Sequence, residues 1–146
     1  MSASQATIGY GAKFFTGAPG SPITYTEVVE SAVITPNDFT VGVIDVTHLN
    51  SPSATKENIP GLVAPGTIEV MGNFTGVASQ LALDALAVGR TIFPWKITAP
   101  ATATTVLTMT GTGFITKLET GPFETEKKTD LKFSVQITGP ITKVVV

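Results

Sequence analysis

Residues 130–138 read DLKFSVQIT and alternate apolar and polar side chains without a break. The apolar positions are Leu131, Phe133, Val135 and Ile137. Successive side chains of a β-strand point to opposite faces, so this pattern predicts a strand with one buried face and one solvated face. We therefore expect a core built from strands.

Two further stretches support that expectation. Residues 67–74 (TIEVMGNF) alternate in the same way, with Ile68, Val70 and Phe74 on the inward parity. Residues 106–119 are long enough for an extended strand, in which the glycines of residues 111–113 predict a bulge or bend.

Three weaker candidates have less regular patterns. Residues 23–33 are rich in strand-forming residues, and residues 38–49 carry apolar side chains on both parities, which is typical of a strand covered on both sides. Residues 91–98 (TIFPWKIT) contain Pro94, which should place that strand at a sheet edge or a bulge.

One segment predicts a helix, over residues 79–88. Ser79 is positioned to cap it, and Leu83 and Leu86 form its apolar stripe. Gly89 is positioned to end it in the left-handed conformation.

The composition favours the same class of fold. The 14 Gly and 10 Pro punctuate a chain whose regular segments are dominated by Thr, Val and Ile, which suit strands separated by frequent turns. We predict an all-β protein: a sandwich or barrel of two antiparallel sheets with one short flanking α-helix. The predicted core consists of Ile68, Val70, Phe74, Leu83, Leu86, Trp95, Phe114, Leu131, Phe133, Val135 and Ile137.

Three segments fall outside this pattern. Residues 1–22 show no periodicity and predict an extended N-terminal arm before a single domain of residues 23–146. Residues 50–66 read as a long inter-strand loop, in which Ile59, Leu62 and Val63 are apolar and should bury against something. Residues 141–146 read as a short apolar tail.

Charge and cysteine content exclude several function classes. Only 14% of the residues are charged, well below the usual share, which indicates that partners cover part of the surface. The net charge of −2 argues against a basic face that binds nucleic acid. The chain has no cysteine, so it can form neither a disulfide nor a thiolate metal site. We expect no signal peptide and no membrane span.

No constellation of residues predicts catalysis, a metal site or a cofactor. His48 is the single histidine, and one histidine makes a poor metal site. The carboxylate pairs Glu27/Glu30 and Glu124/Glu126 read as solvated charge, and the phosphate-binding glycine motifs are absent. We therefore expect that the protein is not an enzyme.

Taken in order, the segments resemble the major tail tube proteins of long-tailed bacteriophages. The resemblance covers residues 28–144 and depends on the order and spacing of degenerate patterns. They are KENIPGLVAPGTIEVMGNF (residues 56–74), the helix of residues 79–88, the strand with a proline exit at residues 93–100, GTGFITKLET (residues 111–120) and DLKFSVQITGPITKV (residues 130–144).

The resemblance implies hexameric rings that stack into a hollow tube in the virion, assembled in the cytoplasm of the bacterial host. It implies a tape-measure protein and tail-end proteins as partners, and double-stranded DNA in transit without specific binding. An acidic balance suits a channel that must not hold phosphate. The predicted contacts between rings are Leu49, Lys56, Glu57, Asn58, Ile59, Leu62 and Val63 of the loop, and Tyr10, Phe14 and Phe15 of the N-terminal arm.

Other functions stay open at this point. A tail terminator and a type VI secretion tube protein share the implied fold. A carbohydrate-binding sandwich is a further class, but it needs a platform of exposed aromatic residues, and Trp95, Tyr10 and Tyr25 are scattered along the chain.

Overall fold

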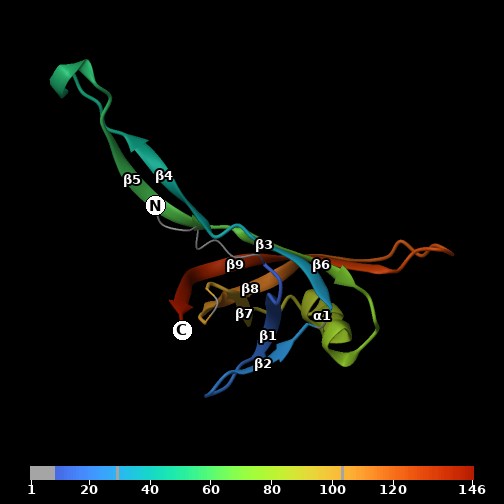
Figure 1. Cartoon of the computed structure of the whole chain (residues 1–146). Coiled ribbons are helices and arrows are strands. Elements are labelled where there is room, and N and C mark those ends of the chain that lie inside the picture. The colour runs from blue at the N-terminus through green and yellow to red at the C-terminus, as the bar shows by residue number, and fades with distance from the viewer. Residues whose placement is uncertain (1–8, 29, 103) are drawn as a thin grey trace, which may run out of the picture.

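A computed structural model describes residues 9–28, 30–102 and 104–146. Strands dominate it, with one α-helix and one short 3₁₀ turn (Figure 1). The elements are β1 (Lys13–Ala18), β2 (Thr24–Glu27), β3 (Ser31–Pro36), β4 (Phe39–Asp45), the 3₁₀ turn (Pro52–Ala54), β5 (Asn58–Pro65), β6 (Thr67–Asn73), α1 (Ala78–Val88), β7 (Phe93–Pro100), β8 (Val106–Thr120) and β9 (Asp130–Val145).

The strands form two antiparallel sheets. The larger has the order β2-β1-β7-β8-β9-β6-β3, and the smaller consists of β4 and β5. The large sheet curls, because the Phe14 ring of β1 lies 5.4 Å from the Phe133 ring of β9 although two strands separate them in the sheet. The all-β class with two antiparallel sheets and one flanking helix is confirmed.

The core fills the concave side of this sheet. Its largest fully buried side chains include Trp95, Phe14, Phe93, Ile68 and Leu83, and Leu83 is supplied by α1. Of the predicted core residues, Ile68, Val70, Leu83, Trp95, Leu131, Phe133, Val135 and Ile137 are buried, and Phe74 and Leu86 are partly buried against them.

Phe114 is a correction to the predicted core. It is half-buried and lies opposite Gln136, on the polar parity of β9. Directly opposite residues of an antiparallel pair share a face, so Phe114 points to the outer side of the sheet and its neighbour Ile115 takes the core position. The register shifts of β8 fall between Thr110 and Thr112, where the bulge is predicted, and again between Ile115 and Lys117.

The predicted N-terminal arm is wrong for Lys13–Ala18. These residues form β1, which pairs with β2 on one side and with β7 on the other. Phe14 is completely buried and belongs to the core. Its strand escaped prediction because glycines and prolines surround it. Residues 1–8 of the predicted arm lie outside the described residues.

Two other strands differ from expectation. Pro94 lies in β7, the third strand of the large sheet, and not at a sheet edge. The pairing of β7 with β1 ends at Trp95–Thr16. Pro94 lies just beyond this last pair, so its missing N–H removes no hydrogen bond to β1. The predicted apolar tail is the second half of β9, which continues through Gly139 and Pro140 to pair with the start of β8.

The helix ends are also set differently from the prediction. Ser79 makes no capping hydrogen bond; instead Gln80 ties the preceding loop to α1, because its Oε1 accepts the Thr75 N–H at 2.8 Å and its Nε2 donates to the Asn73 carbonyl at 2.8 Å. Gly89 has a right-handed φ of −75°, and Arg90 after it takes the positive φ of 52°. No helix among the described residues is long and apolar enough to span a membrane.

Candidate functional site

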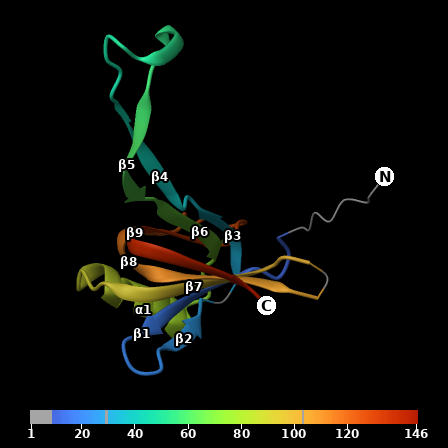
Figure 2. The ribbon, with the colours of Figure 1, turned by 90° about the vertical axis from the view of Figure 1, so that its left-hand side faces the viewer.

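The most unusual feature of the molecule is a projecting ribbon made by β4 and β5, which we call the long hairpin (residues 39–65). It leaves the large sheet and extends well beyond it, as both views show (Figures 1 and 2). The loop expected at residues 50–66 is thereby corrected: Asn58–Pro65 is a strand paired with β4, and the irregular tip covers only residues 46–57. Prolines at positions 60 and 65 are tolerated because each strand of a two-stranded ribbon has one open edge.

The long hairpin continues the β3–β6 hairpin across a tight junction. The Asn37 N–H donates to the Thr67 carbonyl at 2.7 Å, and the Gly66 N–H donates to the Asp38 carbonyl at 3.0 Å. A Cβ on Gly66 would lie 1.7 Å from the Asn37 carbonyl oxygen, so only glycine fits there. An ion pair between Asp38 and Lys143 fastens this junction to β9.

Both faces of the long hairpin are apolar. Directly opposite residues of the two strands share a face. The register of the pairing shifts by one residue between Val41–Val63 and Val43–Pro60, opposite Gly42. One face carries the pairs Phe39–Pro65, Val41–Val63 and Val43–Pro60, and the other carries Thr40–Ala64 and Ile44–Ile59.

At its base the long hairpin meets β9, where Phe39, Val63 and Pro65 line a hollow with Gly139, Pro140 and Ile141. Beyond that base the hairpin projects away from the rest of the described chain (Figures 1 and 2). Every residue of β4 is exposed, Val43 by 73%, and Leu62 of β5 is exposed by 91%. No charged side chain occurs in residues 39–44 or 59–65. Such a surface is typical of a region that another protein covers.

The tip is held by its own hydrogen bonds. The Ser51 hydroxyl donates to Glu57 Oε2 at 2.6 Å, and His48 Nε2 lies 3.4 Å from the same oxygen. The Glu57 N–H donates to Thr47 Oγ1 at 2.8 Å, which closes the turn. Leu49 projects from this turn fully exposed.

Asp45 supports the tip from the end of β4. Its Oδ1 accepts the Thr47 N–H at 2.9 Å. Hydrogen bonds from the side chain and then the backbone of Thr47 hold the pKa of Asp45 below its usual value, because they favour the ionised carboxylate.

The predicted loop contacts divide between two elements of the long hairpin. The tip holds Leu49, Lys56 and Glu57, and β5 holds Asn58, Ile59, Leu62 and Val63. Lys56 and Asn58 are exposed polar residues there. The apolar partner strand, with Phe39, Val41 and Val43, was not among the predicted contacts, although apolar residues on both of its parities were visible in the sequence.

The predicted N-terminal contacts do not form one surface. Tyr10 is 86% exposed, whereas Phe14 is a core residue and cannot serve as a contact. Phe15 lies on the outer face of β1, where the Lys96 ammonium sits 4.7 Å from its ring centre and 4.8 Å from that of Tyr25. This cation–π cluster secures β1, β2 and β7 to one another.

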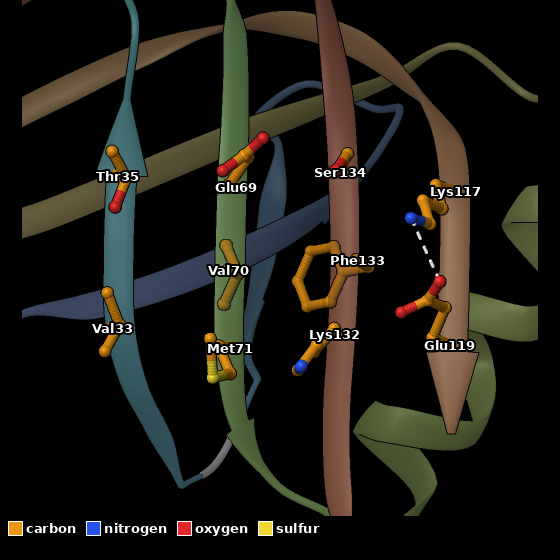
Figure 3. A pocket seen from close by; sticks show the side chains of 10 residues that line it. All are labelled: Val33, Thr35, Glu69, Val70, Met71, Lys117, Glu119, Lys132, Phe133 and Ser134. Atoms are coloured by element: carbon orange, nitrogen blue, oxygen red, sulfur yellow. Dashed lines mark ion pairs between the residues drawn. The ribbon is translucent and has the colours of Figure 1, made fainter. Parts of the chain in front are cut away.

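The convex face of the sheet across β3, β6, β9 and β8 has a different character. It holds a hollow of about 200 Å³ in which Glu69 lies beside Ser134, and Met71 beside Lys132, on the paired strands β6 and β9 (Figure 3). Lys117 pairs with Glu119 at 3.0 Å on its rim. Both signs of charge occur there, as expected for a face in contact with water.

The remaining candidates do not assemble into a reactive site. His48 sits in the tip with Glu57 and Ser51, and no group of three potential metal ligands occurs among the residues described. Trp95 is fully buried and faces the core, so it cannot stack on a sugar.

Comparisons with known proteins identify the fold. No family model matches the chain, and no curated protein sequence matches it either. Three solved structures are similar to it over most of its length. The first is the tail of an empty gene transfer agent particle with C6 symmetry, at 13% identity and a TM-score of 0.75, covering 95% of this chain and 99% of that one. The second is the SPP1 tail tube, at 15% identity and a TM-score of 0.68, covering 94% of this chain and 78% of that one. The third is the sheath/tube terminator of the PVC extracellular contractile injection system, at 10% identity and a TM-score of 0.71, covering 98% of this chain and 99% of that one.

These structures match the chain from end to end rather than in one motif. At 10–15% identity the likeness lies in the arrangement of strands and helix and not in individual side chains. The resemblance seen in the sequence is thus confirmed at the level of the fold: the chain has the fold of tail tube proteins.

Proposed function

We propose that this protein is the structural subunit of a tail tube, which self-assembles into stacked hexameric rings around a channel for DNA delivery. The observation that carries the proposal is the long hairpin, which is uncharged over residues 39–44 and 59–65 and exposed on both faces, in a chain with the tail tube fold. A single copy leaves this apolar surface exposed to solvent, and contact with other copies of the same chain buries it.

The energetics favour association. Burying one large aliphatic side chain stabilises by about 1.5–3 kcal/mol. Exposed aliphatic side chains of the long hairpin include Val41, Val43, Ile44, Ile59, Leu62 and Val63. Burial of this set contributes a free energy of the same order as the cost of bringing two subunits together, which is about 4–15 kcal/mol.

The large sheet supports a ring. Its order leaves β2 and β3 as two different open edges. Pairing of unlike surfaces on successive copies is heterologous, and it closes into a ring when the rotation between subunits divides a full turn. Joining β2 of one copy to β3 of the next would remove both edges, which otherwise invite aggregation.

The other parts of the proposal follow from a tube. A tape-measure protein would occupy the channel before DNA, tail-end proteins would close it, and the protein would reside in the virion after assembly in the host cytoplasm. A net charge of −2 suits a channel that DNA crosses without being held. The proposed role is structural and requires neither catalysis nor a cofactor.

A tube terminator is the second candidate, because one of the similar structures is a sheath/tube terminator. The long hairpin favours the repeating subunit, since an open stack needs an extension on one end of each ring. A carbohydrate-binding module is disfavoured by the burial of Trp95 and by the Lys96 side chain over Tyr25.

Light scattering after size-exclusion chromatography, over a range of protein concentrations, separates these candidates. A tube subunit gives particles whose mass grows continuously with concentration. A terminator stops at one ring mass. A constant mass of 15.2 kDa together with retention on a glycan column would contradict the proposal and support the carbohydrate-binding module.

A further inference from the structure

His48 organises the tip of the long hairpin, because both its backbone groups and both its ring nitrogens contact neighbouring residues. Its backbone N–H donates to Ser51 Oγ at 3.0 Å, and its carbonyl accepts the Ser51 N–H at 3.0 Å. In the imidazole ring, Nδ1 accepts the Asn50 N–H at 3.1 Å, and Nε2 lies 3.4 Å from Glu57 Oε2. One residue therefore fixes the turn of residues 48–51.

The contact at Nδ1 determines which ring nitrogen carries the proton. In a neutral imidazole one nitrogen donates a hydrogen bond and the other accepts one. Because Nδ1 accepts the Asn50 N–H, the hydrogen bonds assign the proton to Nε2, on the side of Glu57. The turn of the structure is thus the turn of an uncharged His48.

A second proton on the ring does not fit this turn. It binds Nδ1, and both nitrogens of an imidazolium are donors. The Asn50 N–H would then face another N–H group, so it must turn away to a different acceptor or to water. Histidine side chains change their charge between about pH 5 and 8, so this conflict arises close to neutral pH.

The same proton has the opposite effect at Nε2. It turns the contact with Glu57 into an ion pair, which keeps the ring beside that carboxylate. The tip projects away from the large sheet (Figure 2), so the charged groups around His48 come from the hairpin itself. They are Glu57, Lys56 next to it in the chain, and Asp45, whose Oδ1 accepts the Thr47 N–H. Since the ring is held, the backbone of residues 49–50 is the part that moves.

We infer that the tip is a pH-dependent switch, in which a proton on Nδ1 of His48 releases the Asn50 N–H and reorients Leu49 between them. Leu49 is the fully exposed apolar side chain of this turn, and the turn sets its direction. The apolar surface that the tip offers to a partner therefore differs between the uncharged and the charged state of His48. The switch lies within one chain, so its test does not depend on the proposed self-assembly.

NMR of the full chain, below the concentration at which it assembles, tests the switch. The signals to follow between about pH 8 and 5.5 are the His48 ring, the Asn50 amide and the Leu49 methyl groups. We expect the three sets to move together with one midpoint. The Asn50 amide proton should shift upfield as the pH falls, because it loses its acceptor.

The variant His48→Asn is the matched control. Its Oδ1 can take the place of Nδ1 as acceptor for the Asn50 N–H, and an amide side chain does not titrate. The Asn50 and Leu49 signals of this variant should stay where they are at the upper end of the pH range. Circular dichroism at both ends of the range checks that the fold is unchanged.

The variant Glu57→Gln separates the histidine from its carboxylate partner. A glutamine still offers an oxygen to the Ser51 hydroxyl, so the movement of Asn50 and Leu49 should persist. Loss of the movement in this variant, or the same movement in His48→Asn, would show that another group drives it and would overturn the inference. The inference also fails if the His48 ring titrates in the wild type while the Asn50 and Leu49 signals stay fixed.

Discussion

Gly66 is the residue on which the direction of the long hairpin depends. Its backbone passes so close to Asn37 that a Cβ would lie 1.7 Å from the Asn37 carbonyl oxygen. We predict that Gly66→Ala destabilises the fold by about 1–3 kcal/mol, since backbone cannot yield as a flexible side chain can. Urea unfolding measures the change.

Gly42 in β4 is the matched control for that substitution. The nearest atom to a Cβ there is the Leu62 carbonyl oxygen at 3.6 Å, an ordinary contact. Gly42→Ala should therefore leave the free energy of unfolding within about 0.5 kcal/mol of the wild type. Equal effects at the two glycines would show that the junction is not the tight point described above.

Asp45 gives a prediction about pH. Hydrogen bonds from Thr47 lower its pKa in the folded state, so the support it gives to the tip is complete above the unfolded pKa and is lost as pH falls through the lower folded value. The amide signal of Thr47 in an NMR titration should therefore move with a midpoint below 3.8. A midpoint at or above that value would mean that the bond does not form in solution.

At the scale of elements, the long hairpin should be separable from the fold. Phe39 and Pro65 lie opposite each other, so an Asn-Gly turn can replace residues 40–64 and close the ribbon at its base. We predict that this variant keeps the large sheet, because the core contains no residue of the hairpin, and that it forms no tubes. Circular dichroism and light scattering measure the two properties, and tubes of normal length would refute the role assigned to the hairpin.

The comparison of sequence and structure is also clearest at the element scale. The start of β9, together with β6 and β8, could be predicted because alternation is read directly from neighbouring residues. The strand β5 could not, since Pro60, Gly61 and Pro65 are local turn signals that pairing with β4 overrides. The same holds for β1, whose apolar Phe14 becomes a core residue only through contacts with β9 far along the chain.

The candidate site was visible in part for the same reason. Ile59, Leu62 and Val63 stood out as apolar residues in an apparently irregular segment, which marked the region as a contact surface. Their partners on β4 and the closure of the tip by Ser51 and Glu57 depend on which strands pair, and a single sequence does not specify that.

At the scale of the whole molecule, the surfaces assigned to assembly are apolar, and this predicts how salt acts. About 1 M NaCl shortens the Debye length to roughly 3 Å and weakens ion pairs, but it leaves apolar association intact. When the assay is run at about 1 M NaCl and not at about 0.1 M, we expect the critical concentration for assembly to stay the same or to decrease. A steep rise, measured by light scattering, would mean that charged contacts hold the subunits together.

We propose that copies of this chain assemble into rings around a channel. Negative-stain electron microscopy of the purified full-length protein at high concentration tests it most directly, because end views show symmetry and channel in the same image. We expect annular end views with sixfold symmetry and side views of stacked rings. A field of separate small particles with no annulus at any concentration would contradict it.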